Sequence, residues 1–110
     1  MARAKRRAVA RQTASSILNP TSVAKKLRDG LKTELKRLRI NATVQVEAVP
    51  GTSLRRFYVV ASSFRHMPYA DRQNVVWNIG RLVLRPEELL VVSMIVTVTP
   101  AEMKEQAAYG

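Results

Sequence analysis

The sequence predicts an α+β domain in which a three-stranded mixed sheet carries helices on one face, in the order α-β-β-α-β-α. Three observations lead to this fold class. Apolar residues recur with helical spacing in two segments, and two shorter segments alternate between apolar and polar residues, as half-buried strands do. A nearly continuous apolar run follows near the C-terminus. At 110 residues, the chain is long enough for a single modest core.

The first helix is expected to follow Asn19 and Pro20, to have Thr21 or Ser22 as its N-cap, and to end near Leu38. Apolar residues recur along one side of it, at Val23, Leu27, Leu31, Leu35 and Leu38. Basic residues follow the same period on the opposite side, at Lys25, Arg28, Lys32, Lys36 and Arg39. This basic stripe would be roughly 20 Å long at the usual helical rise.

A hairpin is predicted next. Residues 42–48 alternate between apolar and polar types, Pro50 and Gly51 mark a turn, and residues 57–62 alternate again. Two alternating segments joined by such a turn favour an antiparallel pair of strands.

The second half of the chain is expected to add a helix, a strand and a short helix. Pro68 suits the first turn of a helix that ends before Pro86, with its buried side marked by Val75, Val76, Ile79, Leu82 and Val83 and with Arg72 off that side. The run 89–98 reads as a central strand covered on both faces. Residues 99–102 form a capping box that starts a C-terminal helix.

Positive charge dominates the choice of partners. The net charge is +11, and residues 1–39 hold 12 basic against 2 acidic residues, whereas residues 40–110 hold 7 against 6. Residues 1–19 are predicted to be a disordered basic arm, and residues 20–110 a single domain. Such asymmetry suggests an arm that meets the phosphates of nucleic acid or anionic lipid, with a solubilising tail as the plainer alternative.

The predicted nucleic-acid contacts follow from this charge. They are Arg3, Lys5, Arg6, Arg7, Arg11, Lys25, Arg28, Lys32, Lys36, Arg39, Arg65, Arg72 and Arg81. No apolar run is long enough to predict a transmembrane segment. The expected location is the cytoplasm or the nucleoid, or an organelle matrix if residues 1–22 are a transit peptide.

Catalysis is not expected. The chain has one histidine, no cysteine and no glycine-rich phosphate loop, and the pair Glu87 and Glu88 reads as a solvated connection. His66 is interpreted as a loop residue. We therefore predict a non-enzymatic protein without a metal or cofactor.

The segment 56–79, RFYVVASSFRHMPYADRQNVVWNI, resembles the core of the BolA family, which has a class II KH-like fold. The residues at corresponding places are Phe57, Phe64, Arg72, Val76 and Trp77. Residues 99–102 look like the TPEEW ending of that family, and the resemblance covers about residues 22–104. A KH domain proper clamps nucleic acid with a GxxG loop, which this sequence lacks.

The resemblance implies two activities for BolA-like proteins: iron–sulfur cluster sharing with a monothiol glutaredoxin, and DNA binding with transcriptional regulation. Gln73 and Val91 stand where the family usually has histidines, and neither is an ordinary cluster ligand. Nucleic-acid binding is therefore the favoured hypothesis. Its alternatives are a small structural or assembly component of a ribosome or another large ribonucleoprotein, and an adaptor that partners a glutaredoxin.

Overall fold

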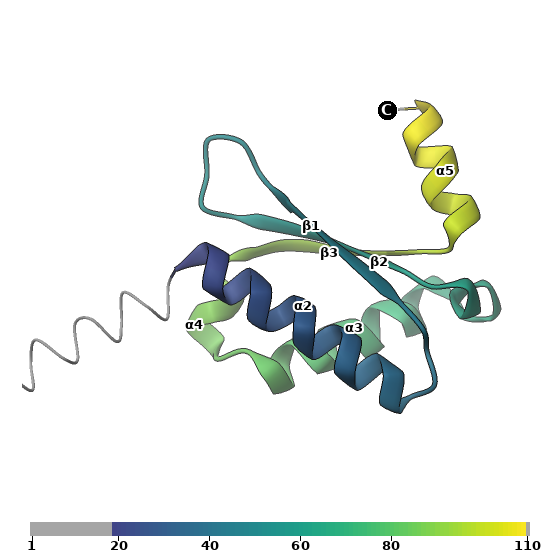
Figure 1. The fold of residues 1–110 in the computed structure, drawn as a ribbon, viewed down its shortest axis with the longest axis horizontal. Coiled ribbons are helices and arrows are strands. Elements are labelled where there is room, and N and C mark those ends of the chain that lie inside the picture. The colour runs from purple at the N-terminus through teal and green to yellow at the C-terminus, as the bar shows by residue number, and fades with distance from the viewer. Residues whose placement is uncertain (1–18, 110) are drawn as a thin grey trace, which may run out of the picture.

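The structure is a computed structural model that describes residues 19–109, and it has the predicted α+β fold class (Figure 1). The elements, in chain order, are α2 (Pro20–Arg37), β1 (Thr43–Ala48), β2 (Arg55–Val60), the 3-10 helix η1 (Ser62–His66), α3 (Tyr69–Val83), α4 (Pro86–Leu89), β3 (Val92–Val98) and α5 (Pro100–Tyr109). The predicted order of helices and strands is confirmed. Two short elements, η1 and α4, were not predicted.

The strands lie in the order β1-β2-β3, with β1 and β2 antiparallel and β2 and β3 parallel. The predicted hairpin is confirmed, and its tight turn is closed by the Thr52 N–H, which donates to the Val49 carbonyl at 3.2 Å. Gly51 has a φ of 76°, which this turn requires and glycine adopts without strain. The prediction that residues 89–98 form a central strand is wrong. The hairpin holds one side of β2 and β3 pairs with the other, which makes β3 an edge strand.

The helices α2 and α3 pack side by side on one face of the sheet (Figure 1). Phe57 and Val59 of β2 and Leu27 and Leu31 of α2 are fully buried in this core. The two helices approach closely at Gly30, where an added Cβ would lie 2.7 Å from the Val83 side chain. The close contact fixes which side of α2 can face solvent.

Several boundaries differ from the sequence prediction. Asn19, rather than Thr21 or Ser22, is the N-cap of α2, because its side chain accepts a 3.1 Å hydrogen bond from the Ser22 N–H. Pro86 opens the helical turn α4, so Leu89 lies in that turn and not in a strand.

Glu88 corrects another expectation, since it is buried and does not lie in a solvated connection. Its carboxylate accepts hydrogen bonds from the Arg85 N–H at 2.8 Å and from Lys26 Nζ at 2.9 Å. The side chain therefore ties α4 to α2.

The C-terminal capping box is confirmed. The Glu102 N–H donates to Thr99 Oγ1 at 3.2 Å, and the Thr99 N–H donates to Glu102 Oε1 at 2.8 Å. From this cap, α5 rises on the side of the sheet opposite α2 and α3 (Figure 1). Of the predicted basic arm, only Asn19 lies within the described residues.

Candidate nucleic-acid interface

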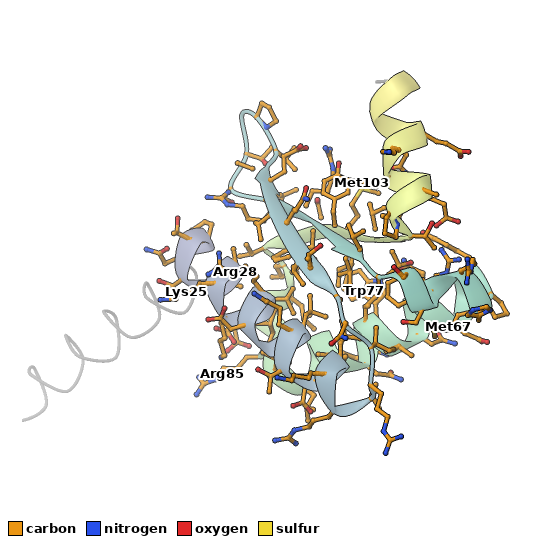
Figure 2. All side chains as sticks on the ribbon, turned by 45° about the vertical axis from the view of Figure 1, so that its right-hand side comes forward. Lys25, Arg28, Met67, Trp77, Arg85 and Met103 are labelled. Carbon is orange, nitrogen blue, oxygen red and sulfur yellow. The ribbon has the colours of Figure 1, made fainter. Side chains whose placement is uncertain are left out.

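Packing gives α2 two different sides. Four apolar side chains, Val23, Leu27, Leu31 and Leu35, are almost completely buried against the sheet and α3. The basic residues at the opposite helical phase are therefore held outward by the burial of their neighbours. Lys25 and Arg28 can be seen on the N-terminal half of this helix in Figure 2.

The basic stripe is Lys25, Arg28, Lys32, Lys36 and Arg39, as the sequence predicts. Arg28 is half-buried and the other four are exposed. The salt bridges of α2 within residues 19–109 join Lys26 to Glu88, Arg28 to Asp29 and Arg37 to Glu34. In this part of the chain, the lysines of the stripe and Arg39 thus have no acidic partner.

The helix dipole explains only part of the stripe. Cations near a helix C-terminus are stabilising, which accounts for Lys36 and the residues around it. No acidic residue lies in the first turn of α2, and Lys25 stands one turn further on, where a cation gains nothing from the dipole. The helix dipole therefore does not account for Lys25 in the N-terminal part of the stripe.

Arg39 occupies an unusual backbone position. It follows the C-cap Leu38 with a φ of 62°, in the left-handed region that favours glycine. The Ile40 N–H donates to the Leu35 carbonyl and the Arg39 N–H to the Lys36 carbonyl, both at 2.9 Å, which makes a Schellman motif. An exposed arginine here costs backbone energy that glycine would not.

Arg55 extends the basic surface from a second element. With Thr21, Ala24, Lys25, Arg28 and Val46 it lines a shallow cavity of about 280 Å³ between the start of α2 and the hairpin. Sequence periodicity could not find this neighbour of the stripe, because the fold brings β2 and α2 together across the chain.

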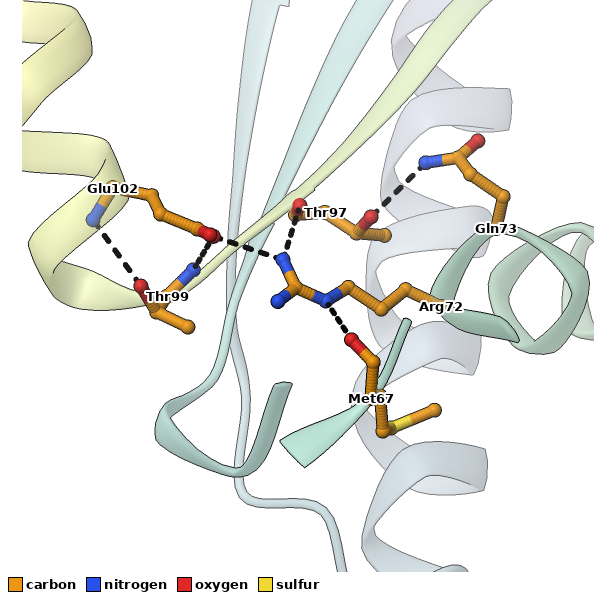
Figure 3. A network of polar contacts seen from close by, with 6 residues as sticks. All are labelled: Met67, Arg72, Gln73, Thr97, Thr99 and Glu102. Carbon is orange, nitrogen blue, oxygen red and sulfur yellow. Dashed lines mark hydrogen bonds and ion pairs between the residues drawn. The ribbon is translucent and has the colours of Figure 1, made fainter. Parts of the chain in front are cut away.

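Arg72 does not belong to the surface and must be removed from the predicted contacts. Its side chain is only 9% exposed, and its Nη1 lies 2.8 Å from Glu102 Oε1. The same nitrogen donates to the Thr97 carbonyl at 3.4 Å, and Nε donates to the Met67 carbonyl at 3.0 Å (Figure 3). Arg72, on α3, thus joins the residue that follows η1 to β3 and α5, which is a structural role.

Gln73, at the position where the BolA family usually has a histidine, also has a structural environment. Its Nε2 donates to the Ile95 carbonyl at 2.9 Å and to Thr97 Oγ1 at 3.0 Å. Its Oε1 accepts a 3.1 Å hydrogen bond from Trp77 Nε1. The amide is thus used to fix α3 on β3.

Two carboxylates are held ionised by these contacts. The Thr99 N–H, then the Arg72 guanidinium, lower the pKa of Glu102 below its ordinary value. Burial opposes ionisation of Glu88, but the hydrogen bonds from the Arg85 N–H and Lys26 outweigh it and lower its pKa. Both carboxylates are thus bound by donors of the fold itself.

The other predicted contacts are scattered. Arg65 is exposed on η1 and Arg81 on α3, where Arg81 donates to Asn78 Oδ1, so neither belongs to the α2 stripe. The remaining predicted contacts, Arg3, Lys5, Arg6, Arg7 and Arg11, lie outside the described residues. His66 is exposed at the end of η1.

Fold and surface together define a small α+β protein with a basic helix face. No family model, curated protein or solved structure matches the chain. Within residues 19–109, no helix is long and apolar enough to cross a membrane. Within the same residues, no three or more His, Cys, Asp or Glu side chains are grouped so that they could hold a metal ion.

Proposed function

We propose that this protein binds the phosphate backbone of nucleic acid through the basic stripe of α2. The observation that carries the proposal is the row of exposed cations on α2 that have no acidic partner within residues 19–109. The row continues to Arg39, whose left-handed backbone conformation glycine would adopt at a lower cost in energy. The contacts that stabilise the fold do not account for this row of cations, whereas binding to a row of phosphates would.

The spacing of the stripe suits a nucleic-acid strand. From Lys25 to Lys36 the helix rises about 16 Å, and a duplex of that length along its axis carries about five phosphates on each strand, at roughly 3.4 Å of axial rise per phosphate. Arg55 adds a further cation beside the start of α2. Binding through such contacts is mainly electrostatic and does not read base sequence.

The test is the salt dependence of binding to a fluorescently labelled duplex, followed by anisotropy. Affinity should fall steeply as salt rises, and the double variant Lys32→Gln with Lys36→Gln should reduce the slope of log affinity against log salt by about 2. If the wild-type chain shows no binding, or an affinity that salt does not change, the proposal fails.

Lys104→Gln is the control, since it removes one positive charge from an exposed position on α5, far along the chain from the stripe. Its slope should stay close to that of the wild-type chain, whereas Lys32→Gln alone should reduce the slope by about 1. An equal change in these two single variants would mean that net charge, rather than the stripe, governs binding.

The BolA-like relationship is part of this proposal, because that family includes DNA-binding regulators. Its support is the sequence segment 56–79 together with the burial of Phe57, Phe64 and Val76 in one core. The glutaredoxin adaptor is less favoured. Gln73 already binds β3 and Val91 is buried, so neither offers a free ligand in place of a histidine.

A role as a component of a large ribonucleoprotein uses the same phosphate contacts. Co-sedimentation with ribosomal particles in a salt gradient would distinguish it from a free DNA-binding regulator. A preference for duplex DNA over structured RNA in the anisotropy assay would favour the regulator.

A further inference from the structure

The two edges of the sheet differ in how their backbone groups are occupied. At β3, the Val98 carbonyl accepts from the Ala61 N–H and so points towards β2. Alternation along the strand then turns Ile95 and Thr97 outward. Their carbonyls accept hydrogen bonds from Gln73 Nε2 and Arg72 Nη1. Side chains of α3 therefore occupy this edge where another strand would pair.

The edge of β1 is open. The Val49 N–H donates to the Leu54 carbonyl, so Val49 and Leu54 form a hydrogen-bonded pair. In an antiparallel ladder, such pairs alternate with pairs that are not hydrogen-bonded. The N–H and C=O groups of Val44, Val46 and Ala48 therefore point away from β2. Within residues 19–109, no hydrogen bond reaches the backbone of these three residues. Five of the six residues of β1 are exposed.

Most devices that usually protect an edge strand are missing from β1, whose one charged residue, Glu47, is paired with Arg56 of β2. The strand has no proline, no lysine and no bulge, since all six of its residues pair in regular register with β2. A regular edge with free N–H and C=O groups is a template for an added strand.

Charge beside this edge indicates what kind of strand fits it. Val46 at the edge shares a shallow cavity with Lys25, Arg28 and Arg55, and the side chain of Val46 is on the same face of the sheet as α2. An added strand would turn every second side chain towards these cations. Acidic residues at alternate positions would meet them.

We propose that the open edge of β1 binds an extended acidic segment of a partner protein by adding a strand to the sheet. Backbone hydrogen bonds to Val44, Val46 and Ala48 supply the pairing, and Lys25, Arg28 and Arg55 select acidic side chains. A second copy of this chain is a poor occupant, because pairing two β1 edges would bring two basic helices together. The proposal does not depend on nucleic-acid binding.

The probe is a capped peptide of about six residues in which glutamate alternates with valine. Amide hydrogen exchange of the full chain, followed by NMR, should show new protection at Val44, Val46 and Ala48. The N–H groups of Thr43, Gln45 and Glu47 point towards β2 in this alternation, so their exchange should change little. A peptide with lysine in place of glutamate should bind at least tenfold more weakly.

Two backbone-methylated versions of the acidic peptide separate strand pairing from simple charge attraction. Methylation of the glutamate amides blocks antiparallel pairing, and methylation of the valine amides blocks parallel pairing. One of the two versions should lose about tenfold or more in affinity while its charge is unchanged. If both bind as well as the parent peptide, strand addition is overturned.

A matched pair of variants tests the protein side. Val46→Pro removes an outward N–H without touching the ladder to β2, a position where edge strands tolerate proline, and should weaken binding about tenfold. Val46→Thr keeps the N–H and should bind nearly as the wild type does. Equal binding by both variants would overturn the proposal.

Other occupants would be recognised in the same spectra. Protection of the three amides in the free chain, together with dimerisation in sedimentation, would assign the edge to a second copy. Protection by a single-stranded oligonucleotide but not by the acidic peptide would assign it to nucleic acid. Either result overturns the proposal.

Discussion

The two long helices place their positive charges in opposite ways. α2 holds Lys25, Lys32 and Lys36 in solvent, whereas α3 turns Arg72 inward, where it bonds two carbonyls and a carboxylate. Basic residues thus lie on the surface of one helix and in the interior contacts of the other. Position relative to the apolar side of the helix, more than the charge itself, decides which role a basic residue has.

Each helix also offers a point at which this contrast can be tested. Lys26 of α2 is bound to the buried Glu88, so not every cation of α2 is available to a ligand. Arg81 of α3 is exposed, so not every cation of α3 is structural. Variants that change one charge at a time can therefore separate stability from binding.

The largest effect is expected at Arg72. Arg72→Met keeps an unbranched side chain beside Phe64 but leaves the Met67 and Thr97 carbonyls and Glu102 without their donor. Loss of these contacts should lower the free energy of unfolding by about 2–4 kcal/mol. Urea denaturation followed by circular dichroism measures this change.

Lys32→Met on α2 is the matched control, because it makes the same kind of replacement at an exposed site. It should change the free energy of unfolding by less than about 0.5 kcal/mol and weaken binding to nucleic acid. A small effect of Arg72→Met on stability, or a large one of Lys32→Met, would contradict the contrast between the helices.

Arg72 also shows what the sequence could have revealed. It precedes Val76 by four residues and Ile79 by seven, which is the spacing of the buried side of α3. The prediction that Arg72 lies off the buried side is therefore wrong, since the spacing alone places it on that side, where arginine rarely lies without a partner. Its partner, Glu102, is 30 residues away and is brought close only by the fold.

Local signals predicted the elements better than their arrangement. The capping box at Thr99 and the apolar period of α2 depend on neighbouring residues, and the structure has the capping box and four of the five predicted apolar positions, whereas Leu38 is an exposed C-cap. The edge position of β3 depends on which strands pair, and that is decided by contacts distant in sequence. The basic stripe was predictable from spacing, whereas the proximity of Arg55 to it was not.

A smaller effect is expected at Glu102, and it depends on pH. The folded state lowers the pKa of this carboxyl, so its contribution to stability is present above the ordinary value of 4.5 and is lost as pH falls through the lowered pKa. Glu102→Gln should therefore cost roughly 1 kcal/mol at neutral pH, since the carboxylate is partly exposed. The difference from wild type should shrink in urea titrations near pH 3.

Glu105→Gln is the control for this titration. Glu105 is exposed on the same helix and makes no hydrogen bond or salt bridge within residues 19–109. Its substitution should therefore change the free energy of unfolding by less than about 0.5 kcal/mol. A Glu102→Gln chain that loses the same stability at both pH values would show that shape, and not ionisation, matters there.

The smallest effect is expected at Arg39, where a change in stability and a change in nucleic-acid binding should have opposite signs. Arg39→Gly removes the left-handed strain of roughly 1–2 kcal/mol, but it adds chain entropy to the unfolded state and removes a cation from the end of α2. A net gain in stability of about 0.5 kcal/mol is expected. Affinity for a nucleic-acid duplex should fall at the same time, with the salt slope reduced by about 1.

Arg39→Lys completes this comparison, because it keeps both the charge and the strained backbone. Its stability and its salt slope should match those of the wild-type chain. Opposite changes in stability and binding for Arg39→Gly, with neither change in Arg39→Lys, would mean that α2 keeps an arginine at a glycine position for its charge. If Arg39→Gly is more stable and binds equally well, the stripe ends at Lys36 and the left-handed arginine has no part in binding.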